Sequence, residues 1–221
     1  MGLDAVRRGV LDDDGYVILR GAVGTDDVDR LRLACEAGEL GPGDWPVPRA
    51  RDWRHSQVDL DVDVRWVCRL RVVLDAVRHV LDGRCFLAQV EGREPRAGGG
   101  LQLLHRDDVA AERPQSAYAL VFLDAFGAAN GATRFVAGSH RGVGLEAPAG
   151  VEHPLATTVH GEAGDVVVFG GTVLHGATVN SSGDRRRTLL ITYCILALEQ
   201  EFRETRALRG VHMDRSEVFG G

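Results

Sequence analysis

The sequence predicts a mainly β protein with flanking helices, and two observations carry that prediction. Helical patterns are confined to residues 1–84, whereas short runs of β-branched and aromatic residues separated by glycine-containing turns fill residues 85–198. Many short strands of this kind are typical of a β-sandwich or a barrel. No internal repeat or linker-like tract interrupts the chain. We therefore expect a single domain over 1–221, with a helical N-terminal part and a β core at 85–198.

Three helices and one strand are predicted in the N-terminal part. Apolar residues on one side favour a short helix at 3–11, and the β-forming run 16–21 follows it as a strand. Thr25, followed by two aspartates, is an N-cap signal for a second helix of about 13 residues. Helical periodicity returns at 66–81 and stops at Gly83.

Residues 39–60 are predicted to form a long irregular loop, because glycine and proline dominate its first half. Trp45 and Trp53 lie in this loop together with several arginines. Two interpretations stay open. The loop is either a lid that contacts substrate, or a segment whose tryptophans pin it to the core.

The β core should contain a series of short strands separated by turns. The final strand is long and apolar, and the run Asn130–Gly131 marks a turn. The predicted strands are 85–90, 101–107, 117–124, 133–137, 166–169, 174–177 and 187–198.

Composition and charge exclude several classes of partner. The formal net charge is −6, so the chain has no electrostatic footprint for nucleic acid or anionic membranes. No apolar run is long enough to span a bilayer, and the first residues contain no secretory signal pattern. The 4 cysteines form no C-x-x-C motif, so we expect buried reduced thiols in a cytoplasmic protein.

His105 and Asp107 form the chemical centre of the sequence. In a strand, side chains two residues apart point to the same face, so both can reach one cavity. One imidazole and one carboxylate are two thirds of the facial triad that holds non-haem Fe(II). Alone, this pattern also fits a solvated His and Asp at the end of a strand.

His175 is the candidate for the second imidazole, because distant strands meet across a barrel. Arg186 follows it by eleven residues, and a guanidinium at that place suits bidentate binding of a carboxylate. Arg185 and Arg187 are alternatives for this role. Strand alternation places both of them on the face opposite Arg186.

The order of these motifs resembles the phytanoyl-CoA dioxygenase-like family over residues 12–195. Its members are Fe(II)- and 2-oxoglutarate-dependent oxygenases on a double-stranded β-helix, which is a cupin-like jelly roll. The resemblance implies such a core at 85–198, with the N-terminal helices packed on one sheet. The motifs that carry it are Asp14–Leu19, His105-x-Asp107, Asn130–His140, His175 and Arg186.

The resemblance also implies the ligands of the site. His105, Asp107 and His175 would bind Fe(II), and Arg186 would pair with the distal carboxylate of 2-oxoglutarate. With O₂, the cosubstrate would be decarboxylated to succinate and CO₂ while a substrate C–H bond is oxidised. Halogenating relatives replace the carboxylate by a small residue, so Asp107 favours hydroxylation, desaturation or oxidative ring closure.

One family position departs from the pattern. Relatives often have a hydroxyl residue two after the distal histidine to help hold the cosubstrate, and here that residue is Ala177. Thr133, Thr178 and Thr188 are the candidates to compensate, with Thr133 predicted as a cofactor contact.

Gln89 and Gln102 occupy places where relatives put polar groups that bind cosubstrate or substrate. Strand parity points Gln102 away from the face of His105, so this role requires a bulge. The alternative for both residues is an ordinary surface or interstrand role.

The substrate is expected to be a small molecule, such as a glycoside or another natural-product intermediate. Trp45, Trp53 and Arg93 are the candidate substrate contacts. The compact chain without lysine favours a bacterial tailoring enzyme of antibiotic biosynthesis, with orthoester or methylenedioxy bridge formation as one possible reaction. The oligomeric state stays open. The competing functions are a metal-binding, cupin-like hydrolase and a non-catalytic binding module.

Overall fold

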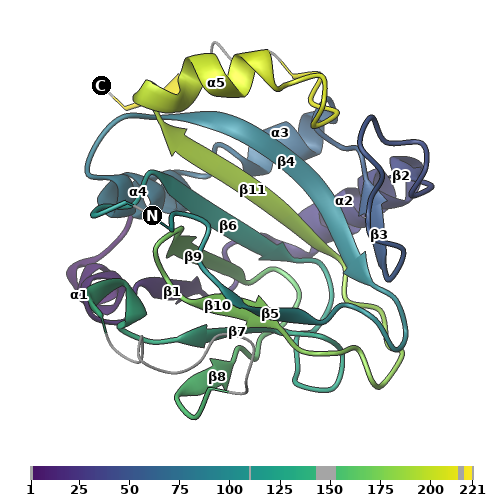
Figure 1. Ribbon diagram of the computed structural model, residues 1–221, viewed down its shortest axis with the longest axis horizontal. Coiled ribbons are helices and arrows are strands. Elements are labelled where there is room, and N and C mark those ends of the chain that lie inside the picture. The colour runs from purple at the N-terminus through teal and green to yellow at the C-terminus, as the bar shows by residue number, and fades with distance from the viewer. Residues whose placement is uncertain (1, 110, 143–152, 214–216, 221) are drawn as a thin grey trace.

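Two antiparallel sheets face each other in the computed structural model, which describes residues 2–109, 111–142, 153–213 and 217–220 (Figure 1). In the larger, 8-stranded sheet, six strands follow in the order β1 (Tyr16–Leu19), β9 (Val166–Gly170), β6 (Ser116–Phe122), β11 (Thr188–Ile195), β4 (Cys85–Pro95) and β3 (Trp53–Ser56). The short β2 (Glu39–Leu40) extends the edge at β3, and β12 (Val218–Phe219) pairs with β4. The 4-stranded sheet has the order β5 (Gln102–His105), β10 (His175–Ala177), β7 (Thr133–Val136) and β8 (Ala156–Thr158). This is the predicted jelly roll.

The helices are α1 (Ala5–Asp14), α2 (Thr25–Ala37), α3 (Val62–Val67), α4 (Arg71–Leu81) and α5 (Glu199–Glu204), with short 3₁₀ turns at Ser139–Arg141 and Leu196–Leu198. Helices α1 to α4 cover the outer face of the larger sheet, whereas α5 packs through Phe202 against Phe86 and Ala88 of β4 (Figure 1). Alternating residues of β6 and β11, such as Ala119 and Ile191, point outward into a core shared with the helices, whereas Leu120 and Phe122 point inward between the sheets. The predicted packing of the N-terminal helices on one sheet is therefore correct.

The helix predicted at 66–81 is two helices. Asp61 caps α3 by accepting hydrogen bonds from the backbone N–H groups of Asp63 and Val64, both at 3.0 Å. The chain then breaks before α4, where the buried Tyr193 hydroxyl donates to the carbonyl of Cys68 at 2.8 Å. Apolar periodicity runs through this break, so the sequence pattern merges the two helices.

The loop predicted at 39–60 contains two strands. β3 pairs with β4 in the register Trp53↔Pro95 to Ser56↔Gly92, and β2 pairs with β3. β4 runs to Pro95, beyond the predicted strand 85–90, and so provides the edge on which β3 forms. That partner is remote in sequence, so local composition does not reveal the strand. The strands of the barrel therefore also come from outside 85–198.

Two of the motifs that carry the family resemblance, Asp14–Leu19 and Asn130–His140, pack against each other. The N–H of Gly138 donates to the carbonyl of Asp14 at 3.0 Å, and the ring of Tyr16 stacks on Phe135 with centroids 4.4 Å apart. His140 hydrogen-bonds through Nε2 to the carbonyl of Asp12. These motifs join β1 to β7, the neighbour of β10, and so support the strand that carries His175.

Candidate active site

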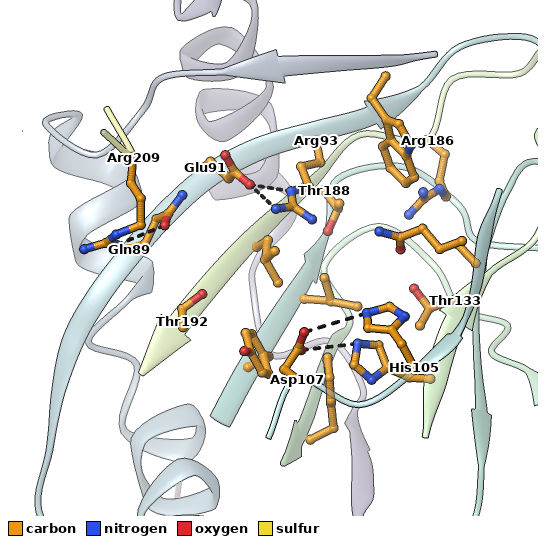
Figure 2. A pocket seen from close by; sticks show the side chains of 18 of the residues that line it. Gln89, Glu91, Arg93, His105, Asp107, Thr133, Arg186, Thr188, Thr192 and Arg209 are labelled. Carbon is orange, nitrogen blue, oxygen red and sulfur yellow. Dashed lines mark hydrogen bonds and ion pairs between the residues drawn. The ribbon is translucent and has the colours of Figure 1, made fainter. Parts of the chain in front are cut away.

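His105, Asp107 and His175 meet at one end of a cavity between the sheets (Figure 2). His105 and His175 stand directly opposite each other on the antiparallel pair β5–β10, with ring centroids 4.4 Å apart. Nε2 of His105 lies 3.7 Å from Oδ1 of Asp107, and Nε2 of His175 lies 3.5 Å from Oδ2. One ligand atom from each residue falls within 4.8 Å of the others, which is close enough to hold a single metal ion.

Asp107 reaches this place from a loop and not from a strand. β5 ends at His105, so the predicted strand 101–107 is too long. The N–H groups of Asp107 and Asp108 both donate to the carbonyl of Gly171 at 3.0 Å, and the Asp108 carboxylate accepts from the N–H of Ser116 at 3.0 Å. A Cβ on Gly171 would lie 2.3 Å from the Ser116 hydroxyl, so glycine permits the close approach. These hydrogen bonds, and not strand alternation, direct Asp107 toward the same place as His105.

Backbone carbonyls select the tautomer of both histidines. Nδ1 of His105 lies 2.8 Å from the carbonyl of Leu103, and Nδ1 of His175 lies 2.9 Å from that of Val173. A carbonyl oxygen only accepts, so each Nδ1 carries the proton and each Nε2 presents a lone pair toward Asp107. Burial lowers the pKa of His175 to about 4, against the opposing charge of Asp107. The ring is therefore neutral at pH 7, which is the form that binds metal.

Arg186 is a buried cation that forms no ion pair in the part of the chain that the structure describes. Its side chain lines the cavity, and the residue is 2% exposed. The Nε and Nη2 atoms have no hydrogen-bond partner. The guanidinium lies over the rings of Phe126 and Trp53, at 4.7 and 5.5 Å from their centroids. Burial lowers the pKa of Arg186 to about 9, although Glu94 opposes the shift. A carboxylate ligand would relieve this cost.

The two alternative arginines are engaged elsewhere. Arg185 forms a two-pronged ion pair with Glu94, at 2.9 and 2.8 Å. Arg187 does the same with Asp124, also at 2.9 and 2.8 Å, and both arginines contact Glu36 of α2. The predicted alternation is therefore present, with Arg186 alone facing the cavity.

Gln102 lines the cavity because β5 contains the required bulge. His175 pairs with His105 and Ala177 with Gln102, so two steps on β10 match three on β5. A Cβ on Gly176 would lie 2.6 Å from the Gln102 carbonyl, so this residue allows the two strands to approach closely. The extra residue turns Gln102 to the same side as His105.

The three candidate hydroxyl residues, Thr133, Thr178 and Thr188, differ in their position relative to the cavity. Thr133 stands opposite Ala177 across β7 and β10, and both line the cavity. The Thr188 hydroxyl donates to the carbonyl of Val121 at 2.9 Å, and that of Thr178, outside the cavity lining, donates to Ala128 at 3.0 Å. Thr133 is thus the best-placed replacement for the hydroxyl absent at Ala177.

The cavity has a volume of about 320 Å³ and a second, polar side formed by β4 (Figure 2). Alternate residues of β4, namely Gln89, Glu91 and Arg93, face it together. Further lining residues come from β6, β11 and the C-terminal segment. They are Tyr118, Leu120, Leu190, Thr192, Phe202 and Arg209.

The predicted cofactor and substrate contacts fall into two groups. Gln89 lies beside Arg209, across the cavity from Arg186, and so is remote from the predicted cosubstrate contact (Figure 2). Trp53 and Arg93 line the cavity, whereas Trp45 is outside the lining. Trp45 is buried under Arg49, whose guanidinium lies 4.6 Å from its ring centroid, and so pins the loop to the core.

Eight lining residues were absent from the prediction: Glu91, Tyr118, Leu120, Phe169, Leu190, Thr192, Phe202 and Arg209. Strand alternation from Gln89 to Arg93 would have indicated Glu91. Arg209 follows the last predicted strand, and no local pattern connects it with the cavity.

Comparisons with known proteins identify the family and the fold. The family model described as phytanoyl-CoA dioxygenase matches residues 11–188. The Fe(II)/2-oxoglutarate-dependent dioxygenase nvfF of Aspergillus novofumigatus is 28% identical over 233 residues, covering 93% of this chain and 74% of nvfF.

Solved structures show the same fold. HygX from Streptomyces hygroscopicus, with nickel and 2-oxoglutarate bound, has a TM-score of 0.72 at 19% identity, covering 88% of each chain. HygX has also been solved with hygromycin B bound. The 2-oxoglutarate-dependent carbocyclase SnoK from nogalamycin biosynthesis has a TM-score of 0.69 at 17% identity, covering 99% of this chain and 94% of SnoK. Within the described residues, no helix is long and apolar enough to cross a membrane.

Proposed function

Because this chain belongs to the phytanoyl-CoA dioxygenase family and is a 2-oxoglutarate-dependent oxygenase, we propose that it oxidises an unactivated C–H bond of a small natural product. The cofactor of this class is Fe(II), and the cosubstrates are 2-oxoglutarate and O₂. In hydroxylation, substrate, 2-oxoglutarate and O₂ give hydroxylated product, succinate and CO₂. In oxidative ring closure the substrate loses two hydrogen atoms instead, and water is an additional product.

The observation that carries the proposal is the unpaired, buried Arg186 in the same cavity as the three metal ligands. Burying a guanidinium without a partner is costly unless a ligand supplies the missing charge. The distal carboxylate of 2-oxoglutarate provides that charge. Phe126 and Trp53 cover the guanidinium and keep water away from this contact.

The residues at the metal end suit Fe(II). Two neutral imidazoles and one carboxylate leave open positions for the keto acid and O₂. When bound, the iron supplies the oxidising chemistry that decarboxylation of 2-oxoglutarate drives. His105 and His175 present Nε2, their orientations held by Leu103 and Val173. Gln102 and Thr133 line the same part of the cavity and are proposed to contact 2-oxoglutarate.

The proposed reaction is a tailoring step in bacterial antibiotic biosynthesis. Asp107 occupies the carboxylate position, which favours hydroxylation or oxidative ring closure over halogenation. The structural similarity to SnoK, a carbocyclase of nogalamycin biosynthesis, and to HygX, which binds hygromycin B, supports a glycoside or a related intermediate as substrate. Orthoester or methylenedioxy bridge formation is one ring closure of this kind. We also place the enzyme in the cytoplasm, because all 4 cysteines are free and buried.

Anaerobic titration tests the proposal. Protein purified without oxygen should give a weak visible charge-transfer band when Fe(II) and 2-oxoglutarate are both added. His105→Ala should lose the band and 2-oxoglutarate turnover while keeping its thermal unfolding temperature. The exposed variant Arg71→Gln serves as the matched control and should behave like wild type.

A zinc hydrolase or a binding module would give a different result. Neither has a use for a carboxylate at Arg186, so 2-oxoglutarate would produce no band and no thermal stabilisation. That outcome in the wild-type protein would refute the oxygenase assignment.

A further inference from the structure

One side of the cavity, formed by β4 and the C-terminal segment, is a charged surface that the oxidation chemistry does not use. We call it the arginine wall and define it as Gln89, Glu91 and Arg93 of β4 together with Arg209; it runs from Arg209, far from Arg186, to Arg93, near Arg186 (Figure 2). The wall combines two cations with one anion. Its hydrogen bonds show which charges are already compensated.

Glu91 is fully engaged by arginines. The residue is 2% exposed, and its Oε1 accepts from both Nε and Nη2 of Arg93. Its Oε2 accepts from Nη2 of Arg49 at 3.1 Å, behind the cavity wall. Burial alone would raise the pKa of Glu91, but Arg93 and Arg49 together hold it below its usual range. Glu91 therefore orients Arg93 and offers no free acceptor to an amine.

Arg209 is a half-buried cation whose described partners are all neutral. Nε donates to the Thr205 hydroxyl at 3.3 Å, and Nη1 donates to Oε1 of Gln89 at 3.2 Å and to the carbonyl of Ala88 at 3.5 Å. Nη2 donates to the carbonyl of Phe202 at 2.6 Å, and the guanidinium lies 4.4 Å from the Phe202 ring centroid. Among the described residues, no carboxylate forms an ion pair with it. Burial lowers the pKa of Arg209, although the Glu201 carboxylate opposes the shift without forming an ion pair.

The wall therefore has an excess of positive charge. Glu91 balances one arginine, Arg93, which leaves Arg209 facing the cavity and Arg49 behind it. The proposed cosubstrate balances Arg186. A substrate that displaces water from the wall leaves the charge of Arg209 desolvated unless it brings an anion.

We propose that the substrate carries a carboxylate and that Arg209, assisted by Arg93, binds it while the C–H bond to be oxidised faces His105 and His175. This inference rests on the proposed function, because it assumes that Arg186 is occupied by 2-oxoglutarate. A cavity of about 320 Å³ shared with 2-oxoglutarate admits only a small acid, or the acidic end of a larger molecule.

Matched probes of one shape and different charge test the proposal. 3-Phenylpropionate, 3-phenylpropanol and 3-phenylpropylamine share the same ring and chain and differ only at the end group. Binding is measured by calorimetry on the full-length protein loaded with Ni(II) and saturating 2-oxoglutarate. The carboxylate should bind roughly ten- to a hundredfold more tightly than the alcohol, as a charge-assisted contact predicts.

Substitutions in the arginine wall test whether its residues cause the preference for the carboxylate over the alcohol. Arg209→Gln should reduce the carboxylate-to-alcohol preference to about threefold or less, and Arg209→Lys should retain part of it, because the charge persists without the planar fork. Arg93→Gln is the second variant if Arg209→Gln fails to fold. Arg71→Gln, exposed on α4, is the control and should leave the preference unchanged.

The outcomes separate this inference from the proposed function. If wild-type protein fails to bind 2-oxoglutarate at all, the proposed function is wrong. If 2-oxoglutarate binds but the amine or alcohol equals the carboxylate, or the carboxylate does not bind up to its solubility limit, the wall proposal is wrong. A preference that survives both Arg209→Gln and Arg93→Gln, with 2-oxoglutarate affinity intact, overturns it as well.

Discussion

The segment 185–187 places similar side chains in two opposite environments. On its outer side, Arg185 and Arg187 form two-pronged ion pairs with Glu94 and Asp124, next to α2. On its inner side, Arg186 is buried against aromatic rings without a carboxylate partner. Paired charges support the fold, whereas an unpaired buried charge lowers stability, which fits the proposed role of Arg186 in binding 2-oxoglutarate. The two environments therefore indicate two roles: Arg185 and Arg187 stabilise the fold, whereas Arg186 is available to a ligand.

Among the substitutions that test this comparison, Arg186→Met is expected to have the largest effect. The change should weaken 2-oxoglutarate binding by roughly tenfold to a hundredfold, because a charge-assisted contact is lost. It should also raise the free energy of unfolding of the ligand-free protein by about 1–2 kcal/mol, because an uncompensated buried cation is removed. Calorimetry and urea unfolding measure the two effects. A large loss of stability would contradict the ligand-binding role.

Arg187→Met should show the reverse pattern. Removing this arginine leaves the largely buried Asp124 carboxylate with weaker partners, so the free energy of unfolding should fall by about 2 kcal/mol. The affinity for 2-oxoglutarate should stay within twofold of wild type, roughly the noise of the assay, because Arg187 faces away from the cavity. A marked loss of affinity in a folded variant would show that the two sides are not independent.

A smaller effect on stability is expected at acid pH, where Asp124 becomes protonated and its ion pair with Arg187 is lost. Burial alone would raise the pKa of Asp124, but its bonds with Arg187 hold it below its usual range. A depressed carboxyl pKa adds stability above the unfolded-state pKa of about 4, and this contribution is lost as the pH falls through the lower folded value. Asp124→Asn should therefore flatten the acid branch of the stability curve by about 1 kcal/mol. Unfolding curves between pH 7 and pH 2 would reveal an unchanged slope if the pair contributes nothing.

Patterns close in sequence predicted much of the fold and of the metal end. The signal at Thr25–Asp27 predicted where α2 (Thr25–Ala37) begins, although its N-cap is Gly24 and Thr25 is the first helical residue, without a capping hydrogen bond from its side chain. Alternation around Arg186 placed its neighbours on the other side. The motif order also predicted that His105, Asp107 and His175 would meet. Each of these inferences depends on short-range periodicity or on a family pattern.

Features that depend on remote partners were missed. β3 exists because β4 provides an edge for it, and Asp107 is aimed by a carbonyl of Gly171 that lies far along the chain. Arg209 reaches the cavity from beyond the last predicted strand. None of these contacts leaves a trace in local composition, because the cause is a neighbour brought near only by folding.

The arginine wall is built from two pieces of different origin. Its β4 residues lie within the part of the chain that matches the family model, 11–188, whereas Arg209 lies after it. The proposed metal ligands and Arg209 are thus separable along the chain. On the proposed role of Arg209, we expect an exchange of the segment after β11 between relatives to alter which molecules are accepted while leaving the reaction intact.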